Sequence, residues 1–258
     1  MSAGYVAPGE AAGAAAQIDA VGRRLTRWGI AVAISTAVLV VAAVAMAALW
    51  FGTSGTRSSE YIAAAEVQRI EVDVGDGDVT VVGGGLDEVA VRRTDHYAYN
   101  RYPSEWRTLD NGVVRISSRC PSLVIGSCAS DYHLTVSDNV PVTIRVERGD
   151  VHLADYRGSA DLESRSGSIT VTRFCGFVLQ AATRQGDIDA TSDCSPERLE
   201  LRTDTGNVHA IVPRGRYRVD TDTNAGTVTV RGITQAVDAP WAIQALSSSG
   251  DVTVEGRS

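Results

Sequence analysis

Acidic residues recur at one position of a short glycine motif, and they are the first candidates for chemistry. The segments VGDGDVTV, ERGDVHLA, SRSGSITV, TRQGDIDA, TDTGNVHA, TNAGTVTV and SSSGDVTV each place a polar residue directly after the aligned glycine. These residues are Asp78, Asp150, Ser168, Asp187, Asn207, Thr227 and Asp251. A row of carboxylates could bind calcium or a sugar, or could hydrolyse a glycosidic bond. Asp and Asn beside a turn glycine also bond the local backbone, and we favour this structural interpretation.

Other reactive residues lack a catalytic or metal-binding spacing. The segment DVGDGD contains Asp73, Asp76 and Asp78 but lacks the acidic spacing and the distal Glu of an EF-hand loop. No nucleophile elbow, Walker loop, HExxH motif or dinucleotide fingerprint occurs. The histidines are scattered, and we expect them to be solvated surface residues: His96, His133, His152 and His209. The sequence therefore predicts no catalytic residue, metal site or cofactor.

The four cysteines predict two structural disulfides. Cys175 and Cys194 each follow a repeat glycine by eight residues, so they occupy the same register in consecutive repeats. Stacked strands lie ~4.8 Å apart, and disulfides accept Cα separations of ~4.4–6.8 Å. Cys120 and Cys128 flank the local loop CPSLVIGSC and form the natural second pair. Such bridges fit an oxidising compartment, with free thiols or a metal site as the alternatives.

The elements that position these residues follow from the repeat itself. Positions two and four after the glycine are apolar in every copy, and positions seven and five before it are apolar except at Thr221. This period of two is typical of a strand with one buried face. Each repeat is thus a strand, a glycine turn with φ above zero, a second strand and a connection. The turn glycines are Gly77, Gly149, Gly167, Gly186, Gly206, Gly226 and Gly250.

A unit of two short strands cannot bury its own core, whereas stacked units can. We therefore predict an all-β domain over residues 66–258, a β-solenoid resembling a right-handed β-helix, with an antiparallel β-sandwich as the alternative. An irregular insertion or cap is expected at about 95–130. The last repeat ends with the sequence, so that end of the stack is expected to be bare or paired with a partner. Aromatic residues of the insertion form a possible binding surface, or else cap the core: Tyr97, Tyr99, Tyr102 and Trp106.

A long apolar segment precedes the repeats. Residues 29–49 carry no charge and would span ~31 Å as a helix, close to the thickness of a bilayer core. Trp28 and Trp50 stand at its two ends, as interfacial aromatic residues do. Three arginines precede it, which predicts a cytoplasmic N-terminus: Arg23, Arg24 and Arg27. A signal peptide cleaved near residues 45–47 is the alternative.

These observations divide the chain into four parts. We expect a disordered cytoplasmic tail at 1–28, a transmembrane helix at 29–50, a linker at 51–65 and an extracytoplasmic β-repeat domain from 66. The predicted location is thus the plasma membrane, with a single span.

The repeat region also resembles a known family. The run YHLTVSDNVPVTIRVERGDVHLADYRGSADLESRSGSITV is similar to the bacterial "putative adhesin" domains of unknown function, in which a strand leads into VP and then into "sGdi.v" units about twenty residues apart. The matching residues are Val140-Pro141, Gly149-Asp150-Val151, Gly167-Ser168-Ile169 and Gly186-Asp187-Ile188. The similarity covers roughly residues 66–256. It implies a surface β-solenoid with an adhesive role, and the family has no agreed catalytic residues to transfer.

Charge and architecture together suggest a function class. The net charge of −7 argues against nucleic acid as a partner. We expect a non-enzymatic, membrane-anchored surface protein, either an adhesin or an envelope scaffold, whose ligand is an unidentified surface protein or glycan. The alternatives are a carbohydrate-active enzyme on a β-helix scaffold and an envelope-stress sensor that signals through the tail.

Overall fold

The computed structural model describes residues 32, 34–48, 54–65, 67–84, 88–98, 101–122, 126–137 and 139–257. The chain divides into two compact units between Thr53 and Ser54. In the first unit, residues 34–48 are helical. The expected tail at 1–28, and residues 29–31, 33, 49 and 50 of the expected membrane helix, lie outside the described residues.

Among the residues that the structure describes, no helix combines the length and hydropathy needed to cross a membrane. The single membrane span therefore stays a prediction.

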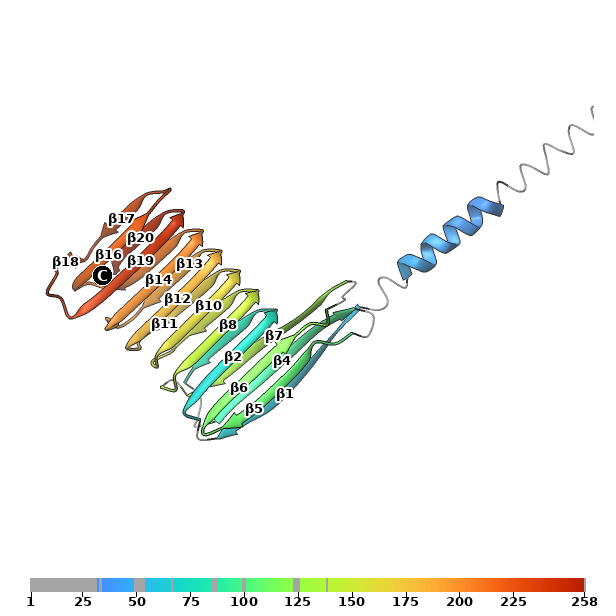
Figure 1. Cartoon of the computed structure of the whole chain (residues 1–258), viewed down its shortest axis with the longest axis horizontal. Helices are drawn as coiled ribbons and strands as arrows, with labels where there is room; N and C mark the ends of the chain where they lie inside the picture. The colour runs from blue at the N-terminus through green and yellow to red at the C-terminus, as the bar shows by residue number, and fades with distance from the viewer. Residues whose placement is uncertain are drawn as a thin grey trace, which may run out of the picture. The chain divides into compact units, whose positions relative to one another are not determined.

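The second unit is all-β and consists of two ten-stranded sheets (Figure 1). Sheet A contains, in spatial order, β1 (Ser54–Ala65), β4 (Glu88–Ala98), β7 (Cys128–Val136), β3 (Val79–Gly83), β9 (Val151–Ala154), β11 (Ile169–Phe174), β13 (Ile188–Ser192), β15 (Val208–Pro213), β20 (Val252–Arg257) and β17 (Val228–Arg231). Sheet B contains β18 (Thr234–Gln235), β16 (Arg216–Thr223), β19 (Trp241–Ser249), β14 (Arg198–Thr205), β12 (Val178–Gln185), β10 (Ala160–Ser166), β8 (Val142–Arg148), β2 (Arg69–Asp76), β6 (Val113–Arg119) and β5 (Ser104–Asp110).

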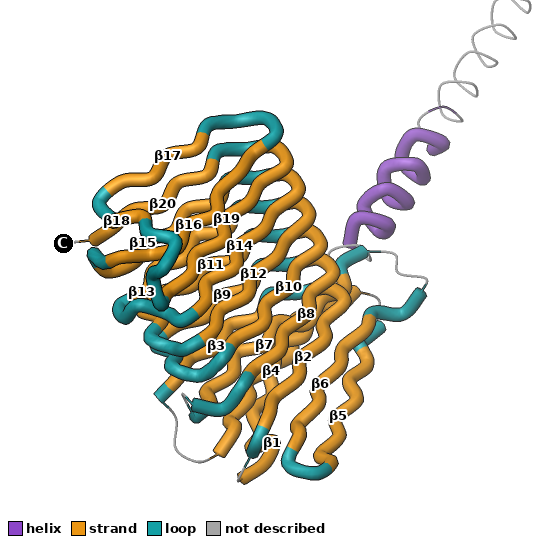
Figure 2. Tube along the Cα trace, turned by 60° about the vertical axis from the view of Figure 1, so that its left-hand side comes forward, coloured by secondary structure: helices purple, strands orange, loops and turns teal. Residues whose placement is uncertain are grey.

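Each repeat forms one coil that visits both sheets (Figure 2). Its first strand lies in sheet B, the chain turns at the glycine, and the second strand lies in sheet A. Strands of neighbouring coils pair in parallel with equivalent residues aligned, for example Leu162 with Ala181 and Ile169 with Ile188. This parallel pairing agrees with the predicted solenoid and excludes the antiparallel sandwich for the repeat region.

The core lies between the sheets, where the alternating apolar residues of every coil meet. Residues such as Leu162, Ile169 and Val208 are at most 1% exposed. Burial of valine, leucine and isoleucine side chains contributes roughly 1.5–3 kcal/mol each, so stacking stabilises every coil that has neighbours on both sides.

The coils do not stack in the order of the sequence. The coil of Gly250 lies between those of Gly206 and Gly226, because β20 separates β15 from β17 and β19 separates β14 from β16. The final repeat is therefore internal, which corrects the expectation that it ends the stack. The loop at 232–240 makes this insertion possible, since the spacing from Gly226 to Gly250 is longer than that between the preceding repeats.

The N-terminal part is more regular than the sequence suggests. Residues 54–65 form β1 rather than a linker, and β1 pairs antiparallel with β4. The expected irregular insertion at 95–130 contains β5, β6 and parts of β4 and β7. β1 and β5 are the edge strands of the two sheets. Because an exposed edge strand can carry polar residues on both faces, the period-2 pattern of apolar residues is weak in these two segments.

Candidate binding face

The residues after the repeat glycines form a ladder that bonds each coil to the next. At this position one side-chain oxygen accepts the backbone amide of the equivalent residue in the adjacent coil, over 2.7–3.3 Å. The acceptor and donor pairs, in spatial order, are Asp131 and Asp78, Asp78 and Asp150, Asp150 and Ser168, Ser168 and Asp187, Asp187 and Asn207, Asn207 and Asp251, and Asp251 and Thr227. These bonds give the acidic residues a structural role and favour the turn interpretation over calcium binding or catalysis.

Hydroxyl groups form a second ladder inside the stack. Three residues before the glycine, a Ser or Thr donates to the glycine carbonyl of the neighbouring coil, over 2.8–3.0 Å. The donors are Ser164, Thr183, Thr203, Ser247 and Thr223. Because buried polar groups need a partner, this ladder satisfies carbonyls at the edge of the core.

The turn glycines are required by two independent constraints. All seven have φ between +128° and +159°, a region in which side chains are strained. A Cβ atom at Gly186 would lie 2.2 Å from the carbonyl oxygen of Gly167, and the other repeat glycines approach a neighbouring carbonyl as closely. The turn edge of the stack is thus occupied by structural contacts.

Both cysteine pairs form disulfides in the structure. Cys175 and Cys194 have a Cα separation of 4.7 Å and join neighbouring coils, as the shared register predicts. Cys120 and Cys128 have a Cα separation of 6.0 Å and close the loop between β6 and β7. Their role is to hold segments together, and the described residues contain no free cysteine.

A set of charged and hydroxyl-bearing residues, most of them buried and here called the N-terminal ion cluster, connects the first strands of the two sheets. It consists of Arg93 and Asp95 on β4, Glu105 and Arg107 on β5, Tyr61 on β1, and Ser130 and Tyr132 on β7. Glu105 accepts hydrogen bonds from the hydroxyl groups of Tyr61, at 2.7 Å, and Tyr132, at 3.0 Å. It also lies 3.3 Å from Nη1 of Arg93 and 3.3 Å from Nε of Arg107.

The charges within the N-terminal ion cluster compensate one another. Asp95 accepts hydrogen bonds from Nε of Arg93, at 2.6 Å, and from the hydroxyl of Ser130, at 2.7 Å. Two carboxylates thus face two guanidinium groups. Burial and the hydrogen bond to Glu105 raise the pKa of Tyr61, so this phenol stays a donor. The cluster therefore connects the two sheets. Because its charges balance, it offers no net charge that would attract a charged ligand.

The repeat pattern does not predict this cluster, although the sequence contains one signal of it. In EVAVRRTDHYA, Arg93 and Asp95 occupy the same alternate positions as Val89 and Val91, which are buried. Charged residues at inward positions of a strand indicate an internal ion pair.

The aromatic residues expected to form a binding surface are divided between the sheets. Tyr97 on β4 and Tyr102 stack with ring centroids 4.4 Å apart. Trp106 lies on β5 in sheet B and is 59% exposed. Tyr99 lies outside the described residues. A single aromatic surface therefore does not form from the described members.

The outer faces of the two sheets differ sharply in charge. On the six central strands of sheet A, the outward positions three and five residues after the repeat glycine, with the positions in register on β7, are His133, Thr135, Thr80, Val82, His152, Ala154, Thr170, Thr172, Asp189, Thr191, His209 and Ile211. The next position toward the turn holds Asp131 and the ladder residues that follow the glycines. The corresponding positions of sheet B are Glu71, Asp73, Thr143, Arg145, Asp161, Glu163, Gln180, Ala182, Glu200, Arg202, Gln244 and Leu246. With neutral histidines, Asp189 alone is charged in the first set, whereas most of the second set is charged.

One row of the sheet A face, here called the uncharged stripe, contains no charged residue across eight strands. Its members are Ile62, Ala90, Thr135, Val82, Ala154, Thr172, Thr191 and Ile211, and a β-bulge at residues 172–173 shifts the register between Thr172 and Thr191. With strands ~4.8 Å apart, the stripe is roughly 34 Å long. Beside it, His133 and His152 flank Thr80 in register, so the fold brings together histidines that the sequence separates. Methyl groups, hydroxyls and imidazoles thus share one flat surface.

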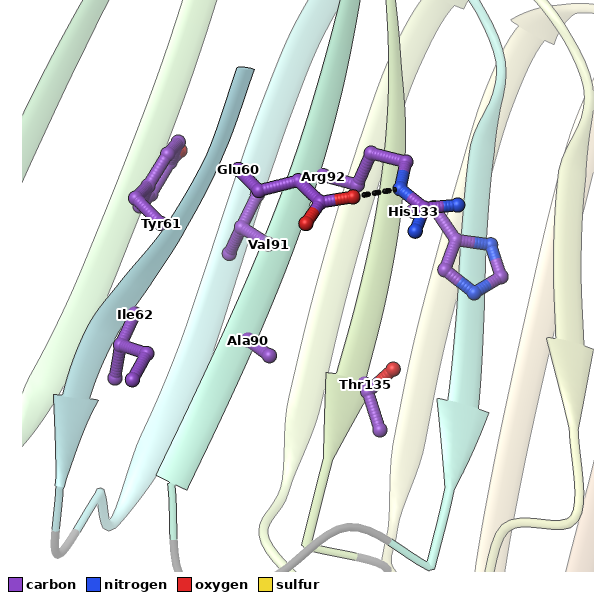
Figure 3. A pocket seen from close by; sticks show the side chains of 8 residues that line it. All are labelled: Glu60, Tyr61, Ile62, Ala90, Val91, Arg92, His133 and Thr135. Atoms are coloured by element: carbon purple, nitrogen blue, oxygen red, sulfur yellow. Dashed lines mark hydrogen bonds and ion pairs between the residues drawn. The ribbon is translucent and has the colours of Figure 1, made fainter. Parts of the chain in front are cut away.

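The stripe begins in a shallow hollow over β1, β4 and β7 (Figure 3). Ile62, Ala90 and Thr135 line it along the stripe, and the ion pair of Glu60 with Arg92 borders it together with His133. The hollow has a volume of about 390 Å³. This part of the sheet A face combines a depression, exposed aliphatic carbon and hydrogen-bonding groups.

The chain matches one family model and is similar to several solved structures. The family model described as Toastrack DUF4097 matches residues 51–255. Among solved structures, the chain is similar to a putative cell adhesion protein from Clostridium sporogenes, at 12% identity and a TM-score of 0.44, over 79% of this chain and 100% of that one. It is also similar to a putative adhesin from Bacteroides fragilis, at 12% identity and a TM-score of 0.47, over 79% of this chain and 97% of that one. No curated protein matches the chain.

Proposed function

Because the chain belongs to the Toastrack DUF4097 family, we propose that it is a non-enzymatic binding module, tethered to the cell membrane, with an adhesive or scaffolding role at the cell surface. The proposal assigns recognition to the sheet A outer face and anchoring to the apolar N-terminal segment. The ligand class it names is an extended, uncharged polymer such as a neutral glycan chain.

Support for the tether comes from the composition of the N-terminal segment. Residues 29–49 are uncharged and follow a cluster of arginines. Apolar side chains of the helical part, such as Val38, Leu39 and Met46, are 61–69% exposed. A lipid environment would cover them, and the arginines would hold the N-terminus in the cytoplasm. The β unit would then stand outside the membrane, in the oxidising compartment that its two disulfides require.

The single observation that carries the recognition surface is the charge difference between the two outer faces. Charged surfaces favour partners of opposite charge and disfavour partners of like charge, whereas the uncharged stripe imposes no such selection. Threonine and histidine side chains can exchange hydrogen bonds with sugar hydroxyls, and aliphatic carbons such as those of Val82 and Ala154 can pack against sugar rings. Repetition at the strand spacing gives an extended ligand many equivalent contacts, so binding would gain from chain length.

A matched pair of variants tests the face. Ala154→Arg places a charge on the uncharged stripe, and Ala182→Arg makes the same change at a half-buried outward position of sheet B. Binding of the full-length protein to neutral cell-surface glycans should fall by about tenfold or more for Ala154→Arg and remain unchanged for Ala182→Arg. Equal effects of the two variants would reject the sheet A face.

The non-enzymatic part of the proposal has its own test. Asp150 and Asp187 already accept backbone amides in the ladder, which leaves them poorly suited to move protons to a substrate. Incubation with a panel of bacterial glycans should give no hydrolysis products. Turnover that Asp150→Asn or Asp187→Asn abolishes would replace this proposal with a carbohydrate-active enzyme.

A further inference from the structure

A second hollow, here called the sheet B hollow, lies over three neighbouring strands of sheet B. These strands are β14, β19 and β16, which lie side by side near one end of the sheet (Figure 1). The hollow has a volume of about 410 Å³. The outward side chains that line it are Arg198, Glu200, Arg218, Asp220, Ala242 and Gln244.

Two of the three strands carry the same charged pair. On β14, Arg198 precedes Glu200 by two residues, and on β16, Arg218 precedes Asp220 by two residues. Residues two apart on a strand share a face, so each pair points outward. The two coils are consecutive in the sequence, but β19 separates their sheet B strands in the stack.

The intervening strand is neutral at both positions. Ala242 aligns with the two arginines, and Gln244 aligns with the two acids. Strands lie ~4.8 Å apart, so the two arginines are roughly 9.6 Å apart at Cα, and so are the two acids. Only a methyl group lies between the arginines. The hollow is thus bordered by positive charge on both sides of one row and by negative charge on both sides of the next.

The acids already accept hydrogen bonds within the protein. Gln244 donates from Nε2 to Asp220 at 2.8 Å, and Gln180 donates from Nε2 to Glu200 at 3.0 Å. Nε of Arg198 lies 3.6 Å from Glu200. A carboxylate offers about four acceptor sites, so both acids keep acceptor capacity for a cation above Gln244.

The arginines keep donors for an anion. Arg218 has no ion-pair partner among the described residues, whereas Arg216, two residues earlier, pairs with Asp238 at 2.8 Å. A guanidinium has five N–H donors, and the long contact of Arg198 with Glu200 occupies few of them. Unpaired positive charge therefore faces the open space above Ala242.

We propose that the sheet B hollow binds a small zwitterion. Its anionic group lies between the two arginines above Ala242, and its cationic group lies between the two acids above Gln244. Arginine forks bind carboxylates through paired hydrogen bonds. A polyanion would meet the row of acids and a polycation the row of arginines, so the arrangement selects a ligand that carries one charge of each sign.

The spacing of the two rows specifies the length of the ligand. The rows are two residues apart along the strands, which corresponds to roughly 6.6 Å. An extended dipeptide has nearly the same length, since each residue spans at most ~3.3–3.6 Å. The ligand class is therefore a dipeptide with a free ammonium group and a free carboxylate. This site is separate from the neutral-glycan surface on sheet A.

Saturation-transfer NMR of the full-length protein in a neutral detergent tests the site, with L-alanyl-L-alanine as the probe. We expect saturable binding. The N-acetylated dipeptide lacks the cation and the dipeptide amide lacks the anion, so each should bind about tenfold more weakly or worse. Free alanine is too short to reach both rows and should also bind more weakly. Equal binding of any of the three, or no saturable binding of the dipeptide, would overturn the proposal.

A matched pair of arginine variants locates the binding. Arg218→Gln should weaken dipeptide binding by about fivefold or more, because one of the two arginines is lost. Arg69→Gln is the control, since Arg69 also precedes an acid, Glu71, but has Val113 and Pro141 as neighbours in its row. Its dipeptide binding should be unchanged. Equal effects of the two variants would reject the sheet B hollow.

A third variant fills the space between the arginines. Ala242→Val should abolish dipeptide binding and leave the melting temperature unchanged, because Val178 occupies the same row on β12. Normal binding by this variant would contradict the proposed position of the ligand. The Ala154→Arg protein should bind the dipeptide normally, so the result is independent of the neutral-glycan proposal.

Discussion

The two ends of the stack differ in how their strand edges and core residues are covered. Every solenoid end exposes strand edges and core, which favour aggregation unless they are covered. At the N-terminal end, antiparallel strands extend both sheets, and the N-terminal ion cluster joins β1 and β7 of sheet A to β5 of sheet B. At the other end, β18 covers two residues of β16, and Val228 remains exposed.

The repeat architecture by itself therefore does not determine whether the strand edges at its two ends are covered. The N-terminal end uses more than 40 residues of non-repeat sequence and a buried polar network. The opposite end uses the coil of Gly226, in which Thr221 replaces the apolar residue of the other coils and Thr227 stands where most of them have Asp or Asn. One end is closed by strands of the chain itself, and the other leaves the edge of β17 and the side chain of Val228 exposed among the described residues.

The largest expected loss of stability comes from removing a residue of the N-terminal ion cluster. Glu105→Ala removes an acceptor for two tyrosines and a counter-charge for buried Arg93, which should lower the free energy of unfolding by about 3 kcal/mol. Asp220→Ala at the other end should cost less than about 0.5 kcal/mol. Urea denaturation followed by tryptophan fluorescence measures both. Similar losses in the two variants would show that the cluster does not close the stack.

A second prediction compares the same glycine substitution in an internal and a terminal coil. Gly186→Ala combines a φ of +151° with a Cβ 2.2 Å from a carbonyl oxygen, so it should destabilise by on the order of 3 kcal/mol. Gly226→Ala has a φ of +159° and a similar contact, but its coil has a neighbour on one side only and can shift. Its loss of stability should be smaller by thermal denaturation. An equal loss would indicate that the terminal coil is as rigid as the interior.

A third prediction uses valines at equivalent positions in adjacent coils. Val252 is fully buried, and Val228 is 43% exposed. Val252→Ala should cost about 2 kcal/mol, whereas Val228→Ala should cost well under 1 kcal/mol. Urea denaturation of the two variants checks this. Equal costs in the two variants would show that the terminal coil buries Val228 as fully as the internal coil buries Val252.

The smallest expected effect concerns acid stability at the end of the carboxylate ladder. The amide and hydroxyl of Thr227 lower the pKa of Asp251 below its ordinary value of 3.8. A lowered pKa in the folded state contributes stability that is present above about pH 4 and is lost as the pH falls below it. Asp251→Asn should therefore flatten the fall in melting temperature below pH 4, compared with the control Asp204→Asn. Identical acid profiles would argue against a role for this rung in stability.

Much of the repeat region could be predicted because its rules are local. Alternation of apolar residues such as Ile169 and Val171 specifies which side of a strand is buried, and the turn glycines specify where the chain reverses. The shared register of Cys175 and Cys194 then follows from stacking. The candidate face was harder, because its residues are adjacent only across strands: Ile62, Ala90 and Thr135 lie far apart in the sequence.

The N-terminal region resisted prediction for a related physical reason. Edge strands such as β1 face solvent on several sides, so they need no strict pattern, and polar sequence there was interpreted as linker and insertion. The buried charges of Arg93 and Asp95 contradict the rule that strands bury apolar residues. They are tolerated because each has a partner on another strand. Arg93 forms an ion pair with Glu105 on β5, and Asp95 accepts a hydrogen bond from Ser130 on β7.

The sequence alone determined the coil: its two strands, its glycine turn, its inward residues and the disulfide between neighbours, because these depend on periods of two and about twenty residues. The tertiary structure decided the order of the last two coils, the closure of one end and the meeting of neutral side chains on one face. Those outcomes depend on which strands lie side by side. Many strand pairings have similar local energies, so the observed pairing is selected by long-range packing.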